Sequence, residues 1–185
     1  GMGSGEIRQF AVSPDGRHVY VPSSLTASGV AILDRSLATG TLTQDPDGKG
    51  CITATGNPIG GVKQCLTDAR LAGNPESLLI SGDGAQVYVA AGDRLTVLAR
   101  DAVTGRLSPS SCVSRLADLG CVPGARNLRS PLYLALSPDG EDLAVGDAVS
   151  GSGLTFFHRG AGGGLVQNPG IDGCISFNGA STDLG

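Results

Sequence analysis

The chain has 185 residues, and its 17 acidic and 13 basic side chains give a formal net charge of −4 without runs of either sign. Scattered charge of this kind argues against nucleic acid as a partner, and no apolar run approaches the roughly 18 residues that a membrane-spanning helix needs. Thirty glycines and ten prolines beside 40% hydrophobic residues favour many short apolar strands separated by turns.

The first five residues, Gly1-Met2-Gly3-Ser4-Gly5, are typical of an expression tag or linker. We therefore expect the folded part of the chain to span residues 6–185. Within it, similar segments recur, and they divide the chain into approximate repeats over 6–65, 66–121 and 122–185.

One turn motif marks each repeat. Its copies are Ser13-Pro-Asp-Gly16, Ser81-Gly-Asp-Gly84 and Ser137-Pro-Asp-Gly140. Asp can bond back to the backbone and Gly supplies a positive φ, so the motif predicts a hairpin between two strands. An apolar run precedes each copy and three more follow it. Four strands per repeat is the content of one propeller blade.

The apolar runs favour an all-β fold. Val30-Ala-Ile-Leu33 and Val87-Tyr-Val-Ala90 are apolar at successive positions, so both faces of each sheet are expected to be covered. The runs are short and bounded by Gly or Pro, which argues against helices. We predict a β-propeller of about three four-stranded blades. Three blades do not close a ring of four to eight, so we expect part of a larger ring, or self-association through open blade faces.

Five cysteines follow the repeat. Cys51 and Cys65 fall in the connection after the fourth strand of the first repeat. Cys112 and Cys121 fall in the corresponding connection of the next repeat. We predict one disulfide in each connection, worth about 3 kcal/mol for a loop of this length. The spacing does not fit a zinc site, and no histidine lies nearby. Cys174 begins a third such loop and is expected to be unpaired, with its partner about where the sequence ends or just past it.

Recurring cysteine pairs indicate an oxidising compartment, which favours a secreted or cell-surface protein. The segments Ser13–Pro22, Val30–Arg35 and Ala38–Leu42 resemble the YVTN/lactonase-like β-propeller repeats. Gly50-Cys-Ile52 and Gly173-Cys-Ile175 resemble the secreted bacterial subtype with a cysteine-containing loop in each blade. The resemblance implies a seven-bladed ring. It implies either a surface or binding protein or a 6-phosphogluconolactone hydrolase, and no lactonase catalytic residue maps onto this chain.

No catalytic, metal or cofactor site emerges from the sequence. His18 and His158 lie about two blades apart, and neither stands beside a nucleophile motif, so we interpret both as ordinary surface or strand-end residues. Asp45 and Asp47 resemble the start of a calcium loop, but the remaining ligands of such a loop are missing, which favours a turn.

The cysteine loops and the links between second and third strands are expected on the same face of the propeller, where we predict any ligand to bind. The candidate binding residues there are Arg70, Arg126, Asp93, Arg94 and Asp147. Arg70 and Arg126 recur five residues after the second cysteine of their loops. Because a repeated residue most simply serves what is repeated, we favour a structural role for these two.

The sequence favours an extracellular binding or interaction module that acts on a protein, a small molecule or a carbohydrate. A lactonase-like hydrolase with its active site partly in missing blades is one alternative. A structural cell-surface repeat protein is another. Acidic, His or Arg side chains converging on a central channel would favour the hydrolase.

Overall fold

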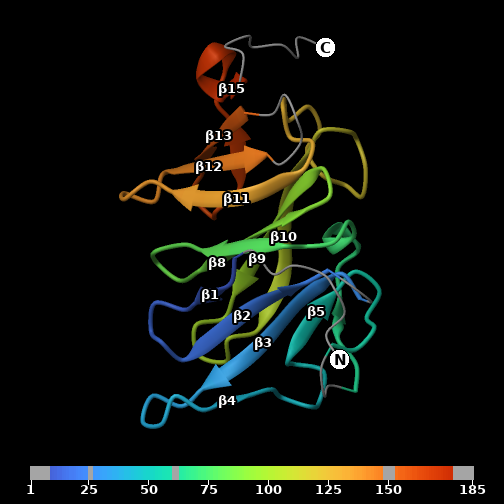
Figure 1. Ribbon diagram of the computed structural model, residues 1–185, viewed down its shortest axis with the longest axis vertical. Helices are drawn as coiled ribbons and strands as arrows, with labels where there is room; N and C mark the ends of the chain where they lie inside the picture. The colour runs from blue at the N-terminus through green and yellow to red at the C-terminus, as the bar shows by residue number, and fades with distance from the viewer. Residues whose placement is uncertain (1–8, 25–26, 60–62, 148–152, 177–185) are drawn as a thin grey trace.

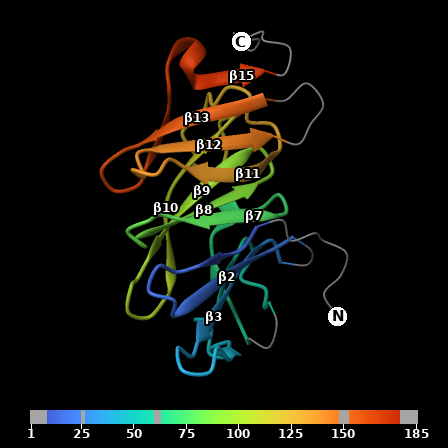
Figure 2. The same cartoon turned by 60° about the vertical axis from the view of Figure 1, so that its left-hand side comes forward.

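A computed structural model describes residues 9–24, 27–59, 63–147 and 153–176, so the linker predicted at residues 1–5 lies outside the described residues. Three sheets follow one another along the long axis of the molecule (Figure 1). We call them blades 1, 2 and 3 in chain order. Blade 2 lies between the other two (Figure 2). The all-β architecture predicted from the sequence is confirmed.

Blade 1 contains β1 (Ala11–Val12), β2 (His18–Ser23), β3 (Gly29–Arg35), β4 (Leu42–Thr43), β5 (Cys51–Thr53) and β6 (Leu66–Thr67). Blade 2 contains β7 (Ser77–Ile80), β8 (Gln86–Ala91), β9 (Arg94–Arg100) and β10 (Leu107–Ser114). Blade 3 contains β11 (Pro131–Leu136), β12 (Asp142–Asp147), β13 (Gly153–Arg159), β14 (Leu165–Gln167) and β15 (Cys174–Ser176). Two short 3-10 helices, η1 (Ala69–Leu71) and η2 (Gly170–Gly173), lie in connections. None of the helices in the described ranges is long and apolar enough to cross a membrane.

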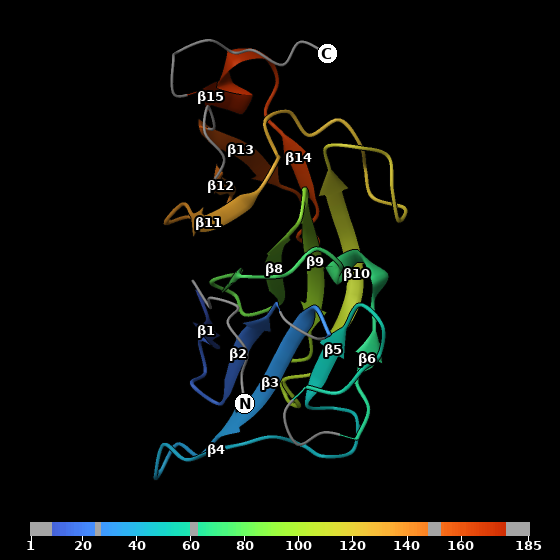
Figure 3. The ribbon, with the colours of Figure 1, turned by 45° about the vertical axis from the view of Figure 1, so that its right-hand side comes forward.

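Each blade is an antiparallel meander of three strands with a fourth strand beside the third. The fourth strand is continuous in blade 2. In blade 1 it is divided into β4 and β5, and in blade 3 into β14 and β15, with both parts pairing to the third strand. β6 joins the outer edge of blade 1 by parallel pairing with β5 (Figure 3). The predicted four-stranded repeat is therefore present, with a divided outer strand in two blades.

The turn motif forms the first hairpin of every blade. Gly16, Gly84 and Gly140 have φ values of 71°, 70° and 76°, which a residue with a Cβ adopts only at a cost. Each glycine N–H donates to the carbonyl of the motif serine at 2.8 to 2.9 Å. The glycine thus closes the reversal that brings the first two strands of the blade together.

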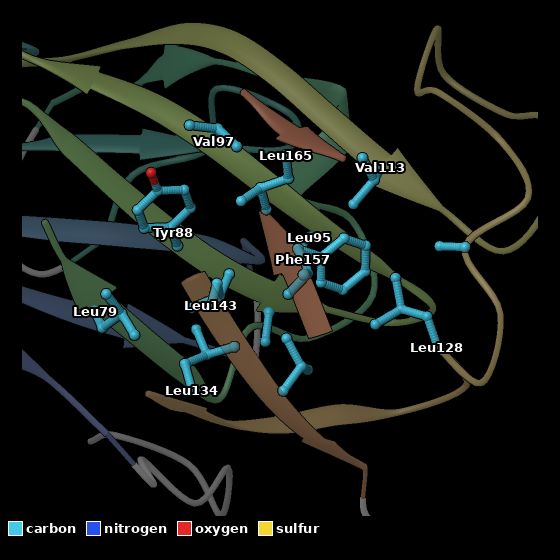
Figure 4. Close-up of a cluster of buried hydrophobic side chains, with 13 residues drawn as sticks. Leu79, Tyr88, Leu95, Val97, Val113, Leu128, Leu134, Leu143, Phe157 and Leu165 are labelled. Atoms are coloured by element: carbon cyan, nitrogen blue, oxygen red, sulfur yellow. The ribbon is translucent and has the colours of Figure 1, made fainter. Parts of the chain in front are cut away.

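Apolar layers fill the spaces between the blades. Between blades 1 and 2 the layer contains Tyr20, Val30, Ile32, Ile52, Leu71, Leu78, Val87, Val89, Leu98 and Leu107. Between blades 2 and 3 it contains Leu79, Tyr88, Ala90, Leu95, Val97, Val113, Ala125, Leu128, Leu134, Leu143, Val145, Phe157 and Leu165 (Figure 4). Successive residues of β8 enter opposite layers, so both faces of the middle blade are buried, as its unbroken apolar pattern predicts.

A buried arginine at the end of β9 ties blade 2 to blade 1. Arg100 donates from Nε to the Tyr20 hydroxyl at 2.7 Å and from Nη2 to Asp15 Oδ2 at 3.0 Å. Its Nη1 donates to the carbonyl of Gly84 in its own blade at 3.2 Å. The Tyr20 hydroxyl in turn donates to the Gly105 carbonyl at 2.8 Å. We call this set of contacts the arginine clamp.

The same clamp joins blade 3 to blade 2. Arg159, at the end of β13, donates from Nε to the Tyr88 hydroxyl at 2.8 Å and from Nη2 to Asp83 Oδ2 at 2.6 Å. The Tyr88 hydroxyl donates to the Gly163 carbonyl at 3.2 Å. Asp15 and Asp83 therefore have a second role that the turn alone does not require, because each accepts a hydrogen bond from the next blade.

We expect Tyr20→Phe to destabilise the chain by about 2 kcal/mol, because the substitution leaves the buried Arg100 Nε and the Gly105 carbonyl without a partner. Ser110→Ala is the matched control, since it also removes a hydroxyl but from an exposed side chain, and a surface change of this kind costs less than about 0.5 kcal/mol. Urea unfolding of both variants measures the difference. Equal effects of the two substitutions would contradict a stabilising clamp.

Candidate functional site

The connections at one end of the blade 2 strands are held close together. The Arg115 N–H, at the start of the cysteine loop, donates to the carbonyl of Asp93 in the β8–β9 turn at 3.2 Å. The Gly92 N–H donates to the carbonyl of Gly73 at 2.8 Å. The cysteine loop thus shares a face with the link between second and third strands, as predicted. We call residues 68–76, 92–94 and 115–125 the loop face.

Both predicted disulfides are present, Cys51–Cys65 and Cys112–Cys121. They occupy the same structural position. The residue after each first cysteine pairs in parallel with the residue after the second, Ile52 with Leu66 and Val113 with Val122. Each disulfide therefore fastens the returning loop to the fourth strand of its own blade, although the two loops differ in length.

Cys174 is a free, buried cysteine. In the strand register it lies opposite Thr155, as Cys51 lies opposite Ala31 and Cys112 opposite Thr96. Cys174 therefore lies at the position from which the other two loops are closed. The sequence has no cysteine after Cys174, and a partner about where the sequence ends or just past it stays a prediction.

Arg94 is the charged centre of the loop face. Its side chain is only 10% exposed. Nη1 donates to the Ala72 carbonyl at 2.7 Å, and Nη2 donates to Asp118 Oδ2 at 2.5 Å and to Asp93 Oδ1 at 3.3 Å. Arg94 thus connects three separate segments, and most of its donors are used within the molecule. Two of the candidate binding residues, Asp93 and Arg94, are brought together here.

The two repeated arginines occupy one position in the connections that precede blades 2 and 3. The carbonyl of Arg70 accepts from Thr96 at 2.8 Å, and the carbonyl of Arg126 accepts from Thr155 at 3.4 Å. The Arg70 guanidinium holds both carboxylate oxygens of buried Asp68, at 2.8 and 2.9 Å. Both arginines thus fasten a connection to the blade that follows it.

Asp147 ends β12, and its carboxylate accepts from the N–H groups of Arg129 at 2.7 Å and Ser130 at 2.9 Å. It holds the connection that leads into blade 3. Asp118, by contrast, joins the loop-face network without having been singled out from the sequence. It lies inside a disulfide loop of unrepeated sequence, so no pattern could mark it.

The loop face also carries exposed apolar side chains. Leu116, Leu119 and Val122 are 54%, 47% and 63% exposed. All three lie within or directly after the loop that Cys112–Cys121 closes. Leu119 has a φ of 48°, a left-handed conformation that costs a leucine free energy and persists only where its surroundings hold it. A closed loop therefore presents a small apolar surface to solvent.

A separate cavity of about 270 Å³ lies where the β9–β10 turn of blade 2 meets blade 1. The residues that line it include His18, Asp34, Lys49, Thr104 and Arg106. These groups carry both signs of charge. In the described part of the chain, no three His, Cys, Asp or Glu side chains come close enough to hold a metal ion.

His18 lies at a strand end, but it is buried, whereas the sequence favoured an ordinary surface or strand-end residue. It is the first residue of β2, and its Nδ1 lies 2.9 Å from Arg100 Nη2. Because arginine can only donate, Nδ1 must accept, which leaves the proton of the neutral ring on Nε2. Nε2 lies 3.6 Å from Asp34 Oδ1. In this arrangement His18 cannot act as a general base through Nε2.

Neither the protein-family models nor the curated proteins include a match to this chain. Solved structures do match. The β-propeller domain of Cps50 (Swd1) from Myceliophteria thermophila has a TM-score of 0.51 at 16% identity, over 86% of this chain and 41% of that one. The fold is that of a β-propeller.

Two further matches are propellers with lactonase names. A putative 6-phosphogluconolactonase from Bacteroides uniformis has a TM-score of 0.60 at 16% identity, over 92% of this chain and 44% of that one. The periplasmic gluconolactonase of Pseudomonas aeruginosa has a TM-score of 0.50 at 18% identity, over 91% and 44%. The chain spans less than half the length of these propellers, and identities this low show the fold alone.

We expect one free thiol per chain when protein prepared under oxidising conditions is unfolded without reductant, since four of the five cysteines are paired. A non-reducing peptide map should place the two bonds at Cys51–Cys65 and Cys112–Cys121. Before unfolding, Cys174 should react slowly because it is buried. Five reactive thiols in folded protein would contradict the pairing.

We expect the stability of the chain to fall as pH drops from 7 to 5. Burial, and then the charge of Arg100, lower the pKa of His18, so the unfolded state binds more protons than the folded state below about pH 6.5. His18→Gln places at this position the residue that blade 2 has there, Gln86, and should flatten the dependence. Urea unfolding at pH 5, 6 and 7 measures it, and parallel curves for the two proteins would contradict the assignment.

Proposed function

We propose that the chain is part of an extracytoplasmic β-propeller module that binds a protein partner through the loop face. The observation that carries the proposal is the group of exposed apolar side chains, Leu116, Leu119 and Val122, on a loop closed by a disulfide. Soluble proteins rarely keep such side chains together at the surface unless they contact a partner.

The loop face is suited to binding because it is already ordered. The Cys112–Cys121 bond closes the loop, and Arg94 holds Asp118 within it to the Ala72 carbonyl of the neighbouring connection. Association costs less when interface groups are immobile before binding. An apolar centre with charged groups around it, such as exposed Arg115, is also the usual anatomy of a protein interface.

A protein partner fits these residues better than a carbohydrate does. Sugars are commonly recognised by aromatic faces and convergent polar groups, whereas the exposed side chains here are aliphatic. The disulfides support a location outside the cytoplasm, because bonds of this kind persist in oxidising compartments.

A lactonase-like hydrolase is the second candidate, because several structural neighbours carry lactonase names. The charged cavity beside His18 would be its natural site in this part of the ring. His18 itself counts against it, since its Nδ1 is occupied by Arg100 and its Nε2 carries the proton. General-base catalysis requires a free nitrogen within reach of the reacting proton.

The test is a selection of peptides from a random phage library on the folded chain, followed by affinity measurements on variants. We expect Leu116→Ser with Val122→Ser to weaken the selected peptides at least about tenfold, a loss of about 1.4 kcal/mol. Leu37→Ser with Val103→Ser is the matched control, because these residues are also exposed, at 56% and 86%, and lie in the β3–β4 and β9–β10 turns.

Peptides that bind both double variants as well as the parent chain would overturn the loop-face proposal. Hydrolysis of gluconolactone above the buffer rate, retained in Leu116→Ser with Val122→Ser and lost in His18→Gln, would favour the hydrolase instead.

A further inference from the structure

Blades 1 and 3 each expose positions whose equivalents are buried in the blades that have a neighbour on that side. One such position is the leucine opposite the clamp arginine, which faces the preceding blade. Leu107 pairs with Arg100 and Leu165 pairs with Arg159, and these leucines are 1% and 6% exposed. In blade 1 the same pair is Leu42 with Arg35, and Leu42 is 47% exposed.

A second position behaves in the same way on the opposite side of the molecule. In blades 1 and 2 the cross-strand pairs Val30–Ile52 and Leu95–Val113 are buried against the following blade. The equivalent pair in blade 3 is Leu154–Ile175, whose members are 45% and 55% exposed. The open side of blade 3 thus presents the surface that builds a core elsewhere in the molecule.

We define two faces from these comparisons. The leading face is the open side of blade 1, with Phe10, Val12, Leu33, Arg35 and Leu42. The trailing face is the open side of blade 3, with Tyr133, Asp139, Asp142, Leu154 and Ile175. The leading face corresponds to the side of blade 2 that contacts blade 1, and the trailing face corresponds to the side of blade 2 that contacts blade 3.

Each face also carries one half of the arginine clamp. Arg35 donates to the Gly16 carbonyl of its own turn at 3.1 Å, as Arg100 does to Gly84. Within the described residues, however, no carboxylate lies within ion-pair distance of Arg35, whereas Arg100 and Arg159 each have one. The leading face therefore offers a cation that lacks the aspartate of a preceding blade.

The trailing face offers the complementary group. Asp139 Oδ1 accepts from Ser137 and from the Glu141 N–H, as the turn requires. Its Oδ2, the atom that receives an arginine in Asp15 and Asp83, has no arginine partner among the described residues. Asp142 adds a second carboxylate at the position that His18 and Gln86 occupy in the other blades.

We propose that the leading face of one molecule packs against the trailing face of a second copy, with Arg35 of each copy ion-paired to Asp139 of the other. The contact continues the interface already present between the blades and joins opposite charges across an apolar layer. Made twice around a two-fold axis, it closes six blades into a ring, within the range of four to eight that propellers use. This proposal does not depend on the proposed function.

Light scattering coupled to size-exclusion chromatography tests the association. We expect twice the chain mass of 18.5 kDa. Leu42→Glu on the leading face and Leu154→Glu on the trailing face should each raise the midpoint of dissociation at least about tenfold, because both place a charge in the apolar layer. Leu116→Glu, in the exposed cysteine loop of the middle blade, is the matched control and should leave the dimer intact.

Mixing distinguishes this contact from any other dimer. A molecule with Leu42→Glu keeps a normal trailing face, and one with Leu154→Glu keeps a normal leading face, so the equimolar mixture has one intact contact per pair. We expect dimers to reappear in the mixture. Circular dichroism of each variant, with unchanged thermal unfolding, separates a lost contact from lost folding.

Monomers at every concentration would overturn the proposal. A dimer that neither substitution weakens, or a mixture that stays monomeric, would also overturn it. A mass that rises without limit with concentration would contradict the closed ring.

Discussion

Two arginines, Arg100, which is buried, and Arg159, which is partly buried, set the relative position of the blades, and much of the structure is arranged around them. A guanidinium carries five N–H donors, and removing them from water is tolerated only where protein acceptors replace the solvent. For Arg100 these acceptors come from two blades, with Asp15 and Tyr20 on one side and Gly84 on the other. Apolar layers alone tolerate small displacements, whereas this set of directional bonds is satisfied in one arrangement. The clamp therefore fixes the register between sheets that the apolar layers hold together.

The clamp explains why the chain uses different chemistry at the two ends of its blades, the hairpin end and the loop end. At the hairpin end of the blades, the turn aspartate and the tyrosine must remain in place for the arginine, and hydrogen bonds to Ser13 and Arg17 and the contact with Arg100 keep the pKa of Asp15 far below its ordinary value. Burial raises the pKa of Tyr20 to about 12, so its hydroxyl stays protonated and can donate. Among the described residues, no such network recurs at the loop end of the blades. Disulfides and Arg94 hold the connections there, which leaves their remaining positions free to vary in sequence.

The extent to which the sequence could predict this structure follows from what recurs in it. The hairpin turns, the strand order and both disulfides depend on local chemistry that repeats, and the sequence was sufficient to predict them. The arginines at the ends of the third strands also repeat, but which blade receives their guanidinium depends on packing between sheets and leaves no local pattern. The burial of His18 was missed for the same reason, since a lone histidine at a strand start has no partner in sequence. Asp118 could not be found because it lies in an unrepeated loop.

Departures from the repeat are therefore the informative positions once the scaffold is explained. Blade 3 departs at two places in the clamp, where Ala144 replaces the tyrosine and Asp142 replaces the His or Gln of the other blades. At an interface between identical repeats, the tyrosine hydroxyl serves as the acceptor for Arg Nε and as the donor to the next turn. On the trailing face, a tyrosine hydroxyl would bind water, and its aromatic ring would expose a large apolar surface. Alanine removes that surface, while a carboxylate is stable in water and attracts a cation over a longer range than a hydroxyl does. The trailing face of blade 3 thus carries charge where an internal blade has the short-range complementarity of the tyrosine. That exchange suits a surface whose partner must first be found by diffusion, because charge complementarity mainly raises the rate of encounter.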